Sequence, residues 1–364
     1  MKTKIGAITK IRTGKLDANA SSFDGKYPFF TCSKEILKIN SYSYDCECVL
    51  IAGNGDLNVK YFNGKFDAYQ RTYIIEDNSN GLLFMPYLYY FFENYVEELR
   101  KQSIGGVIKY IKLENLTEAS LELPTITEQK RIVKIIETCS KLLTLKNSII
   151  DELDLLIKAR FVEMFGEIDD NPNNYPIVTI DDVCYKVTDG KHGGCQKQED
   201  SGYYYVGARE IFDGEIHYNT ASQITYTDFA KDYKRCNIEV GDLVIVNTGA
   251  TIGKSAIAKS PLTDHTLLQK SVALYKVNKD IVNVLFLQYC YMTHPSLYLV
   301  EDAAAQPNLL ISTIKNTKIY LPSMELQNQF AEFVKQVDKS KLAVQKSLEK
   351  TQQLFDSLMQ EYFG

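Results

Sequence analysis

Two long stretches of the chain place apolar residues at helical spacing. From residue 126 to 163 these positions alternate in steps of three and four, which is the 3.5-residue period of a coiled coil. The first series comprises Ile132, Ile135, Cys139, Leu142, Lys146, Ile149, Leu153, Leu156 and Arg160, with two cations interrupting it. A weaker second series comprises Phe330, Phe333, Val337, Ser340, Val344, Ser347, Thr351, Leu354 and Leu358. Each stretch predicts a helix of roughly 38 residues, about 57 Å long.

The first of these helices is expected to begin after Pro124, because Thr125 and Glu128 have the spacing of a capping box. A helix with this stripe can pack on its own domain or pair with the second helix. Because the stripe is longer than one globular domain needs, the pattern favours pairing of the two helices.

The segments around the helices have the pattern of mixed α and β domains. Short β-rich runs are separated by Gly, Asn and Asp turns, among them YPFF, CVLIAG, RTYII, GYYYVGA, DLVIVN and KSVALYKV. One apolar helix follows these runs in each half of the chain, at residues 86–99 and 283–292. The expected fold class is therefore α+β.

The chain also contains an internal repeat, which appears when it is compared with itself at an offset of 198 residues. At this offset Pro124 falls on Pro322 and Gln129 falls on Gln327, and the register holds without a gap to the C-terminus. The two halves are therefore expected to be copies of one folding unit.

Nearer the start of each copy the offset shifts slightly. Residues 49–55 (VLIAGNG) then pair with 243–249 (LVIVNTG), and residues 70–72 (QRT) pair with 269–271 (QKS). We expect each pair to be the same strand or turn in the two copies.

The stretch NTGATIGKS at residues 247–255 has some features of a nucleotide-binding loop. A phosphate loop needs four residues between its glycines, whereas three separate Gly249 from Gly253. The counterpart in the first copy, residues 53–56, has no Gly-Lys-Ser. We expect a turn shared by both copies and not a phosphate loop. Its glycines allow close approach of a ligand, and Thr248 and Lys254 offer a donor and a charge; the alternative is a plain turn that faces solvent.

Length and composition narrow the class of function. The 364 residues are enough for two domains, and 45% hydrophobic with 24% charged residues is ordinary for a globular protein. The net charge of -5 excludes a protein that coats nucleic acid indiscriminately. Residues 1–122 carry fifteen cationic and fifteen anionic side chains, and residues 167–320 carry fourteen and nineteen. DNA binding would therefore rest on local clusters or on the charge of a partner.

Targeting segments and metal sites are not expected. The N-terminus lacks the apolar core of a signal peptide, and the most apolar window, residues 281–300, contains Asn283, Gln288 and His294. We therefore expect a cytoplasmic protein. Its eight cysteines and four histidines are dispersed, which indicates buried thiols in a reducing compartment, with no metal and no cofactor.

In combination, these motifs resemble the specificity subunit of type I restriction-modification systems. The resemblance is carried by LPTITEQKRIVKII with the helix ending in MFGEIDDNPNNYP, by LPSMELQNQF in the second helix, by the turns LIAGNG and NTGATIGK, and by QPNL at 306–309. It covers both halves of the chain. One departure is GGVIKY at residues 105–110, which stands in the first copy where the second copy has QPNL.

The resemblance implies an α+β fold with two globular α/β target recognition domains. Two long antiparallel coiled-coil helices would separate these domains, in an internal pseudo-two-fold repeat. The implied boundaries are 1–122 for the first target recognition domain, 123–166 for the first spacer helix, 167–320 for the second target recognition domain and 321–364 for the second spacer helix.

The resemblance also implies recognition without chemistry. Such a subunit reads a bipartite target in double-stranded DNA and directs adenine methylation or restriction by partner subunits. The expected partners are two modification (methyltransferase) subunits, and restriction subunits in the full complex. Neither a membrane nor a cofactor is implied.

The candidate DNA-binding residues lie at the predicted turns. Because Arg, Lys, Asn and Gln discriminate bases through pairs of hydrogen bonds, Gln70-Arg71 and Gln269-Lys270 are the leading base readers. Further candidates for contact with DNA are Lys15, Asn54, Lys191, His192, Arg209, Thr248, Lys254 and Gln306.

Two other functions stay open on the residues alone. NPNNY at 171–175 is similar to the Asn-Pro-Pro-Tyr of DNA adenine methyltransferases, although asparagines intervene where the second proline belongs. LIAGNGD has the glycines of a methyl-donor loop, but no alternating strand and helix pattern follows it. A coiled-coil scaffold that binds only protein is the other alternative, supported by the acidic balance of residues 167–320.

Overall fold

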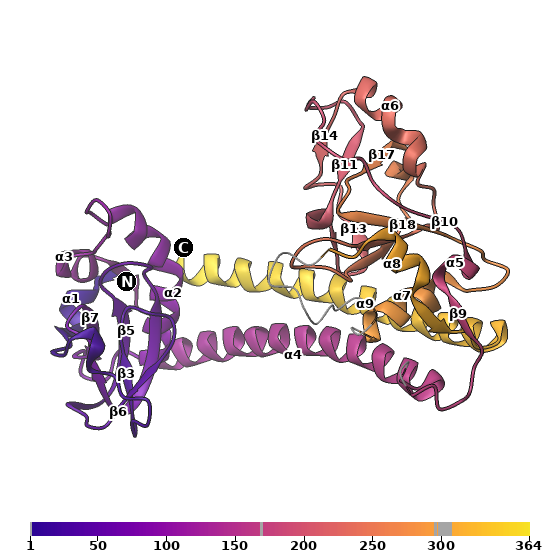
Figure 1. The fold of residues 1–364 in the computed structure, drawn as a ribbon. Coiled ribbons are helices and arrows are strands. Elements are labelled where there is room, and N and C mark those ends of the chain that lie inside the picture. The colour runs from indigo at the N-terminus through magenta and orange to yellow at the C-terminus, as the bar shows by residue number, and fades with distance from the viewer. Residues whose placement is uncertain (1, 168–169, 295–296, 298–307) are drawn as a thin grey trace. The chain divides into compact units, whose positions relative to one another are not determined.

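The computed structural model describes residues 2–167, 170–294, 297 and 308–364 (Figure 1). The chain divides into two compact units. Unit 1 comprises residues 1–148 and 344–364, and unit 2 comprises residues 149–343. Each unit therefore holds one β-rich domain and a segment of both long helices, α4 (Ile126–Phe165) and α9 (Met324–Phe363).

The domain of unit 1 is built on a six-stranded sheet in the order β2-β7-β5-β6-β3-β4. Side chains alternate along the central strand β5: Val49 and Ile51 join the core cluster that contains helix α2, whereas Cys48 and Leu50 join a second cluster. The elements are β1 (Lys2–Lys4), α1 (Ile5–Ile8), β2 (Thr9–Thr13), η1 (Ala18–Ala20), β3 (Tyr27–Phe30), β4 (Leu37–Ile39), β5 (Tyr44–Ala52), β6 (Val59–Ala68), β7 (Thr72–Asp77), α2 (Met85–Gln102), α3 (Leu113–Thr117) and β8 (Ser120–Glu122).

The domain of unit 2 contains a four-stranded sheet in the order β10-β18-β15-β16 and a three-stranded sheet in the order β14-β11-β17. Its strands are β9 (Ile177–Thr179), β10 (Cys184–Asp189), β11 (Tyr204–Val206), β12 (Ile211–Phe212), β13 (Glu215–Ile216), β14 (Ser222–Gln223), β15 (Leu243–Val246), β16 (Ser255–Ile257), β17 (Thr266–Leu268), β18 (Val272–Val277) and β19 (Lys318–Tyr320). Its shorter helices are α5 (Ile180–Val183), η2 (Ala208–Glu210), α6 (Tyr226–Cys236), η3 (Pro261–His265), α7 (Val284–Thr293) and α8 (Ile311–Asn316).

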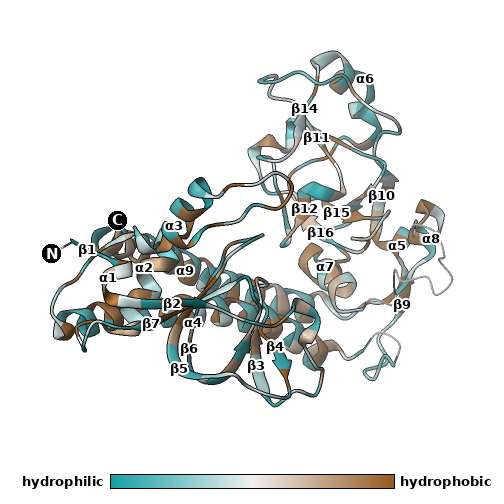
Figure 2. Ribbon diagram, turned by 90° about the vertical axis from the view of Figure 1, so that its left-hand side faces the viewer, coloured by the Kyte–Doolittle hydropathy of each residue, from teal (hydrophilic) through white to brown (hydrophobic). Residues whose placement is uncertain are grey.

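Two helices of unit 2 differ in their surroundings because they differ in polarity. Helix α7, with the sequence VLFLQYCYMT, is mostly hydrophobic in Figure 2, and Phe286, Leu287 and Cys290 are fully buried. Helix α6, with the sequence YTDFAKDYKRC, is mostly hydrophilic and buries only Phe229 and Cys236. None of the helices formed by the described residues is both long and apolar enough to cross a membrane.

Two buried glutamines confirm the internal repeat. In unit 1, Gln129 accepts a hydrogen bond from the backbone N–H of Phe84 at 2.8 Å and donates to two backbone carbonyls. In unit 2, Gln327 accepts from the backbone N–H of Asn283 at 2.8 Å and also donates to two carbonyls. Both glutamines have 0% exposure. Each therefore fastens the start of a long helix to the residue before α2 or α7.

The buried stripe of α4 keeps the predicted seven-residue period, but alternate positions are shifted by one residue. Cys139 is buried as predicted. Leu142 and Leu156 are 42% and 48% exposed, whereas the adjacent Leu143 is half-buried and Ile157 is buried. The prediction was wrong at these positions because the sequence offers two adjacent apolar residues, and packing selects the second one.

The predicted pairing of the long helices is confirmed within each unit. In unit 2, the carboxylate of Asp154 accepts hydrogen bonds from the Lys341 ammonium at 2.6 and 2.7 Å, and Phe161 packs against Phe330. From the first contact to the second, the residue number increases along α4 and decreases along α9, so the two helices are antiparallel. In unit 1, Lys146 donates to the backbone carbonyl of Ser347 and to the hydroxyl of Thr351. The polar residues that interrupt the two apolar series therefore meet one another.

The predicted capping box of α4 is formed on one side. The Thr125 hydroxyl accepts a hydrogen bond from the Glu128 N–H at 3.3 Å, which satisfies one free N–H of the first turn. The Glu128 carboxylate instead pairs with Arg131 at 2.7 Å.

Candidate nucleic-acid interface

In each unit, several loops that flank the strands of the main sheet meet and are joined by backbone hydrogen bonds. We define the loop face of unit 1 as residues 14–17, 31–35, 53–58, 69–71 and 104–110. We define the loop face of unit 2 as residues 190–192, 207–210, 247–254, 269–271 and 308–309. In unit 1, the Gly53 N–H donates to the Arg71 carbonyl at 2.8 Å, and the Gly55 N–H donates to the Lys109 carbonyl at 2.9 Å.

The two loop faces share one backbone network. The bond from Gly53 to Arg71 has its counterpart in the bond from Asn247 to Ser271, at 3.0 Å. The carbonyl of Gly53 accepts from Ile111 at 2.9 Å, as the carbonyl of Asn247 accepts from Leu309 at 2.8 Å. The predicted pairing of residues 49–55 with 243–249 is therefore confirmed.

The predicted pairing of residues 70–72 with 269–271 is wrong by one residue. The Thr72 N–H bonds to the Tyr69 carbonyl at 2.8 Å, and the Val272 N–H bonds to the Gln269 carbonyl at 3.0 Å. The turns therefore match at an offset of 200 residues, so Lys270 is the repeat counterpart of Gln70. The error arose because side-chain similarity set the predicted register, whereas backbone hydrogen bonds set the actual one.

All four candidates of the first copy lie on the loop face of unit 1. Lys15, Gln70 and Arg71 are exposed, and Asn54 is half-buried between Gly53 and Gly55. Gln70 donates a side-chain hydrogen bond to Asp17 at 3.0 Å, which orients its amide. Donors on these side chains can serve phosphate oxygens or base edges.

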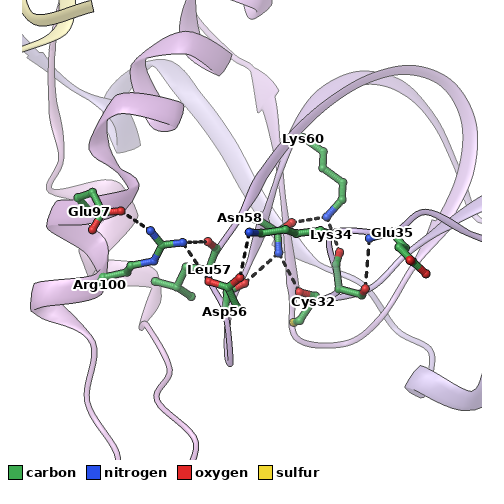
Figure 3. Close-up of polar contacts among 10 residues, drawn as sticks. Cys32, Lys34, Glu35, Asp56, Leu57, Asn58, Lys60, Glu97 and Arg100 are labelled. Atoms are coloured by element: carbon green, nitrogen blue, oxygen red, sulfur yellow. Dashed lines mark hydrogen bonds and ion pairs between the residues drawn. The ribbon is translucent and has the colours of Figure 1, made fainter. Parts of the chain in front are cut away.

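A polar cluster beside these residues was not found from the sequence (Figure 3). Asp56 forms ion pairs with Lys34 at 3.3 Å and with Arg100 of α2 at 3.0 Å. Lys34 and Arg100 together hold the pKa of the Asp56 carboxyl below its usual value. Arg100 also donates to the Leu57 carbonyl at 2.8 Å, and Lys60 donates to the Ser33 carbonyl at 2.7 Å. The cluster therefore fixes the 53–58 turn between α2 and the 31–35 loop, and only contacts distant in sequence reveal it.

On the loop face of unit 2, Lys191 differs from its repeat counterpart Lys15. The side chain of Lys191 is 13% exposed and pairs with Asp232 of α6. His192 is exposed and contacts Asp189 at 2.8 Å. Burial raises the pKa of Asp189, but the hydrogen bonds from Arg235 and His192 outweigh it, so the pKa lies below its usual value.

A cavity of about 340 Å³ brings two other candidates together. Arg209 and Lys254 both line it, although 44 residues of sequence lie between them. Arg209 is exposed on the short helix η2, whose start is held because the buried Glu210 carboxylate accepts from the Gly207 N–H at 2.8 Å. The remaining lining residues are Ala208, Ile211, Phe212, Asp213 and Thr251. Two cations and the one carboxylate of Asp213 leave a net positive charge at the hollow, which suits an anionic group such as a phosphate.

The other candidates of unit 2 have different environments. Thr248 donates a hydrogen bond to the Asn308 side chain at 2.9 Å. Lys270 is exposed, whereas the amide of the half-buried Gln269 fills the space above Gly207. Gln306 lies outside the described residues.

The strings with similarity to enzyme motifs have structural roles. NTGATIGKS is the turn of a hairpin between β15 and β16, so no helix follows it to hold a phosphate. In NPNNY, the amide of Asn171 bonds to both the N–H and the carbonyl of Tyr175 at 2.9 Å, which closes a turn after α4. Within the described parts of the chain, no group of three His, Cys, Asp or Glu residues could hold a metal ion.

The chain is similar to proteins of one kind. A family described as "Type I restriction modification DNA specificity domain" matches residues 1–155 and 172–354. The type I restriction enzyme EcoDI specificity subunit of Escherichia coli is 41% identical over 135 residues, which is 37% of this chain but only 30% of that one. The type I restriction enzyme MjaVIII specificity subunit of Methanocaldococcus jannaschii is 23% identical over 364 residues, which covers 92% of this chain and 85% of that one.

Solved structures show the same fold. The S subunit of a type I restriction-modification system from M. genitalium matches with a TM-score of 0.61 and 16% identity, covering 100% of this chain and 96% of that one. A structure described as the basis of complex assembly and conformational transition in the type I R-M system matches with a TM-score of 0.63 and 16% identity, covering 100% and 97%.

Proposed function

The chain belongs to the type I restriction modification DNA specificity family, and from this premise we propose that it selects a bipartite DNA target for partner subunits. Residues 1–122 and 167–320 are the two target recognition domains in this proposal, and residues 123–166 and 321–364 are the spacer helices. The chain reads double-stranded DNA, and two modification subunits methylate adenine there. Restriction subunits join in the full complex.

The observation that carries the proposal is the pair of loop faces. They are built on the same backbone hydrogen bonds but present different side chains, as the exposed Arg71 of unit 1 has Ser271 at its place in unit 2. One scaffold with two sets of side chains is what a reader of two unlike half-sites requires. A duplicated scaffold that bound only protein would not need donors at the same loops of both copies.

The side chains divide into two proposed roles. Arg71 and Lys270 are exposed at the turns and are proposed to read base edges, with Gln70, Gln269 and Asn54 beside them. The residues proposed to contact phosphates and to set the register on the duplex are Lys15, His192, Arg209, Thr248, Lys254 and Gln306. Lys191 is no longer among them, because Asp232 holds its ammonium.

The test uses the chain assembled with its modification subunits. We expect Arg71→Ala to relax one half of the methylated sequence and Lys270→Ala to relax the other, each by roughly fivefold or more at one position. The measurement is a genome-wide map of methylated sites for each variant. Lys10→Ala and Lys279→Ala, exposed cations at the opposite ends of β2 and β18, are the matched controls. If either test substitution altered both half-sites together, the assignment of one reader to each half would be refuted.

A further inference from the structure

A short hairpin projects from the loop face of unit 1. Ile104 and Tyr110 exchange backbone hydrogen bonds of 3.0 and 2.8 Å, which closes a loop of residues 105–109. Gly105 has a φ of +115°, and a Cβ there would lie 2.6 Å from the Ile108 carbonyl oxygen. The bend therefore requires glycine, and the two hydrogen bonds between Ile104 and Tyr110 close the loop.

The tip of this hairpin is aliphatic and uncovered. Val107 is fully exposed at 104%, and Ile108 is 62% exposed. Exposing adjacent β-branched aliphatic side chains to water is unfavourable, and neither of these two belongs to the core cluster of unit 1. Their place in the fold therefore suggests a contact made outside the chain.

The hairpin is fastened to the turns that carry the proposed base readers. The Gly55 N–H donates to the Lys109 carbonyl at 2.9 Å, and the Ile111 N–H donates to the Gly53 carbonyl at 2.9 Å. Gly53 in turn bonds to Arg71. Lys109 is exposed within the hairpin, and Lys112 is exposed just beyond it. The aliphatic tip thus stands among cations that suit a polyanion, continuous with the proposed DNA-reading face.

We infer that Val107 and Ile108 enter a DNA groove and contact a thymine methyl group in the half-site read by unit 1. In the major groove the thymine C5 methyl is the apolar group among base edges that otherwise present hydrogen-bond donors and acceptors. An aliphatic side chain pressed on a donor or acceptor leaves it without a partner, which disfavours other bases at that place. The tip therefore selects thymine both by attraction and by exclusion. This inference rests on the proposed function.

The test compares wild-type complex with the double variant Val107→Ala/Ile108→Ala, both assembled with modification subunits. The probes are duplexes of the mapped target in which single thymines are replaced by deoxyuridine, which removes the methyl group alone. We expect deoxyuridine at one position of one half-site to weaken wild-type binding by about fourfold. The double variant should bind the thymine duplex about fourfold more weakly than the wild type does. Replacing the thymine with deoxyuridine should not weaken its binding further.

Leu82→Ala is the control, because Leu82 is 61% exposed and follows β7 at the end opposite Arg71. We expect it to retain the full preference for thymine, and both variants to keep the wild-type melting temperature. Equal wild-type affinity for thymine and deoxyuridine at every position of the target would overturn the inference and leave the proposed function intact. Loss of the modification subunit from the double variant would also overturn it, since a protein would then cover the tip. A wild-type complex without any sequence preference would instead refute the proposed function.

Discussion

The two loop faces place a lysine at the same backbone position and use it differently. Lys15 and Lys191 donate their backbone N–H groups to equivalent carbonyls, those of Ala68 at 3.2 Å and Leu268 at 2.8 Å. Lys15 is exposed, whereas the hydrogen bond to Asp232 raises the pKa of Lys191 and holds its side chain at 13% exposure. The difference comes from helix α6, which supplies Asp232. Equal position in a repeat therefore does not imply equal chemistry.

The neighbouring turns differ in the same way. In unit 1 the 53–58 turn is fixed by Asp56, whose carboxylate binds both Lys34 and Arg100. In unit 2 the 247–254 turn leaves a cavity in which Lys254 and Arg209 face a common space. The Asp56 carboxylate is paired with two cations, whereas two cations and the single carboxylate of Asp213 line the hollow of unit 2, which leaves a net positive charge for an anion. The shared backbone supplies the framework, and the side chains decide what each face can bind.

The largest expected effect concerns what the two units share. Gln129→Leu and Gln327→Leu each remove one acceptor and two donor contacts to backbone groups that are mostly half-buried. A hydrogen bond contributes about 0.5–1.5 kcal/mol net, so we expect each variant to lose roughly 3 kcal/mol of unfolding free energy. Urea denaturation measures the loss. Gln336→Leu, at an exposed glutamine of α9, should change little. A large loss of unfolding free energy for one variant and none for the other would show that the two glutamines do not have the same structural role.

An intermediate effect separates the two lysines. Lys191→Ala removes the partner of Asp232, whose side chain is 28% exposed, and should cost about 1–2 kcal/mol of stability. Lys15→Ala should leave the melting temperature unchanged and lower the salt dependence of DNA binding by about one unit of slope. Calorimetry and binding titrations across salt measure the two quantities, with Lys10→Ala as a control for Lys15. The comparison would fail if Lys191→Ala reduced the salt slope without destabilising the protein.

The smallest expected effect concerns the polar contacts of the helix pair. Lys146→Ala in unit 1 and Lys341→Ala in unit 2 each remove one lysine from a half-exposed contact between α4 and α9. We expect each to lower the unfolding free energy by about 0.5–1 kcal/mol. High salt should diminish the effect of Lys341, which binds a carboxylate, more than that of Lys146, which binds neutral oxygens. An equal salt response in the two variants would contradict this distinction.

The sequence by itself determined six of the strands, the apolar helices α2 and α7, the repeat and the period of the long helices. These are properties of local pattern, because a heptad or a strand-turn-strand run is written in consecutive residues. It also placed Lys15, Gln70 and Arg71 at turns, since glycine and polar residues mark where strands end. The corresponding site residues could therefore be named before their neighbours were known.

The tertiary structure alone decided the features that depend on partners distant in the chain. Where α4 has two adjacent apolar residues, such as Leu142 and Leu143, either one preserves the period, and only the surface packed against the helix selects Leu143. The register of Gln70 with Lys270 follows from backbone bonds within the two turns and not from side-chain likeness. Lys191 has a structural role because its ammonium pairs with Asp232, which lies 41 residues further along the chain. Sequence pattern fixes what a residue can do, and the neighbours brought by folding fix which of those things it does.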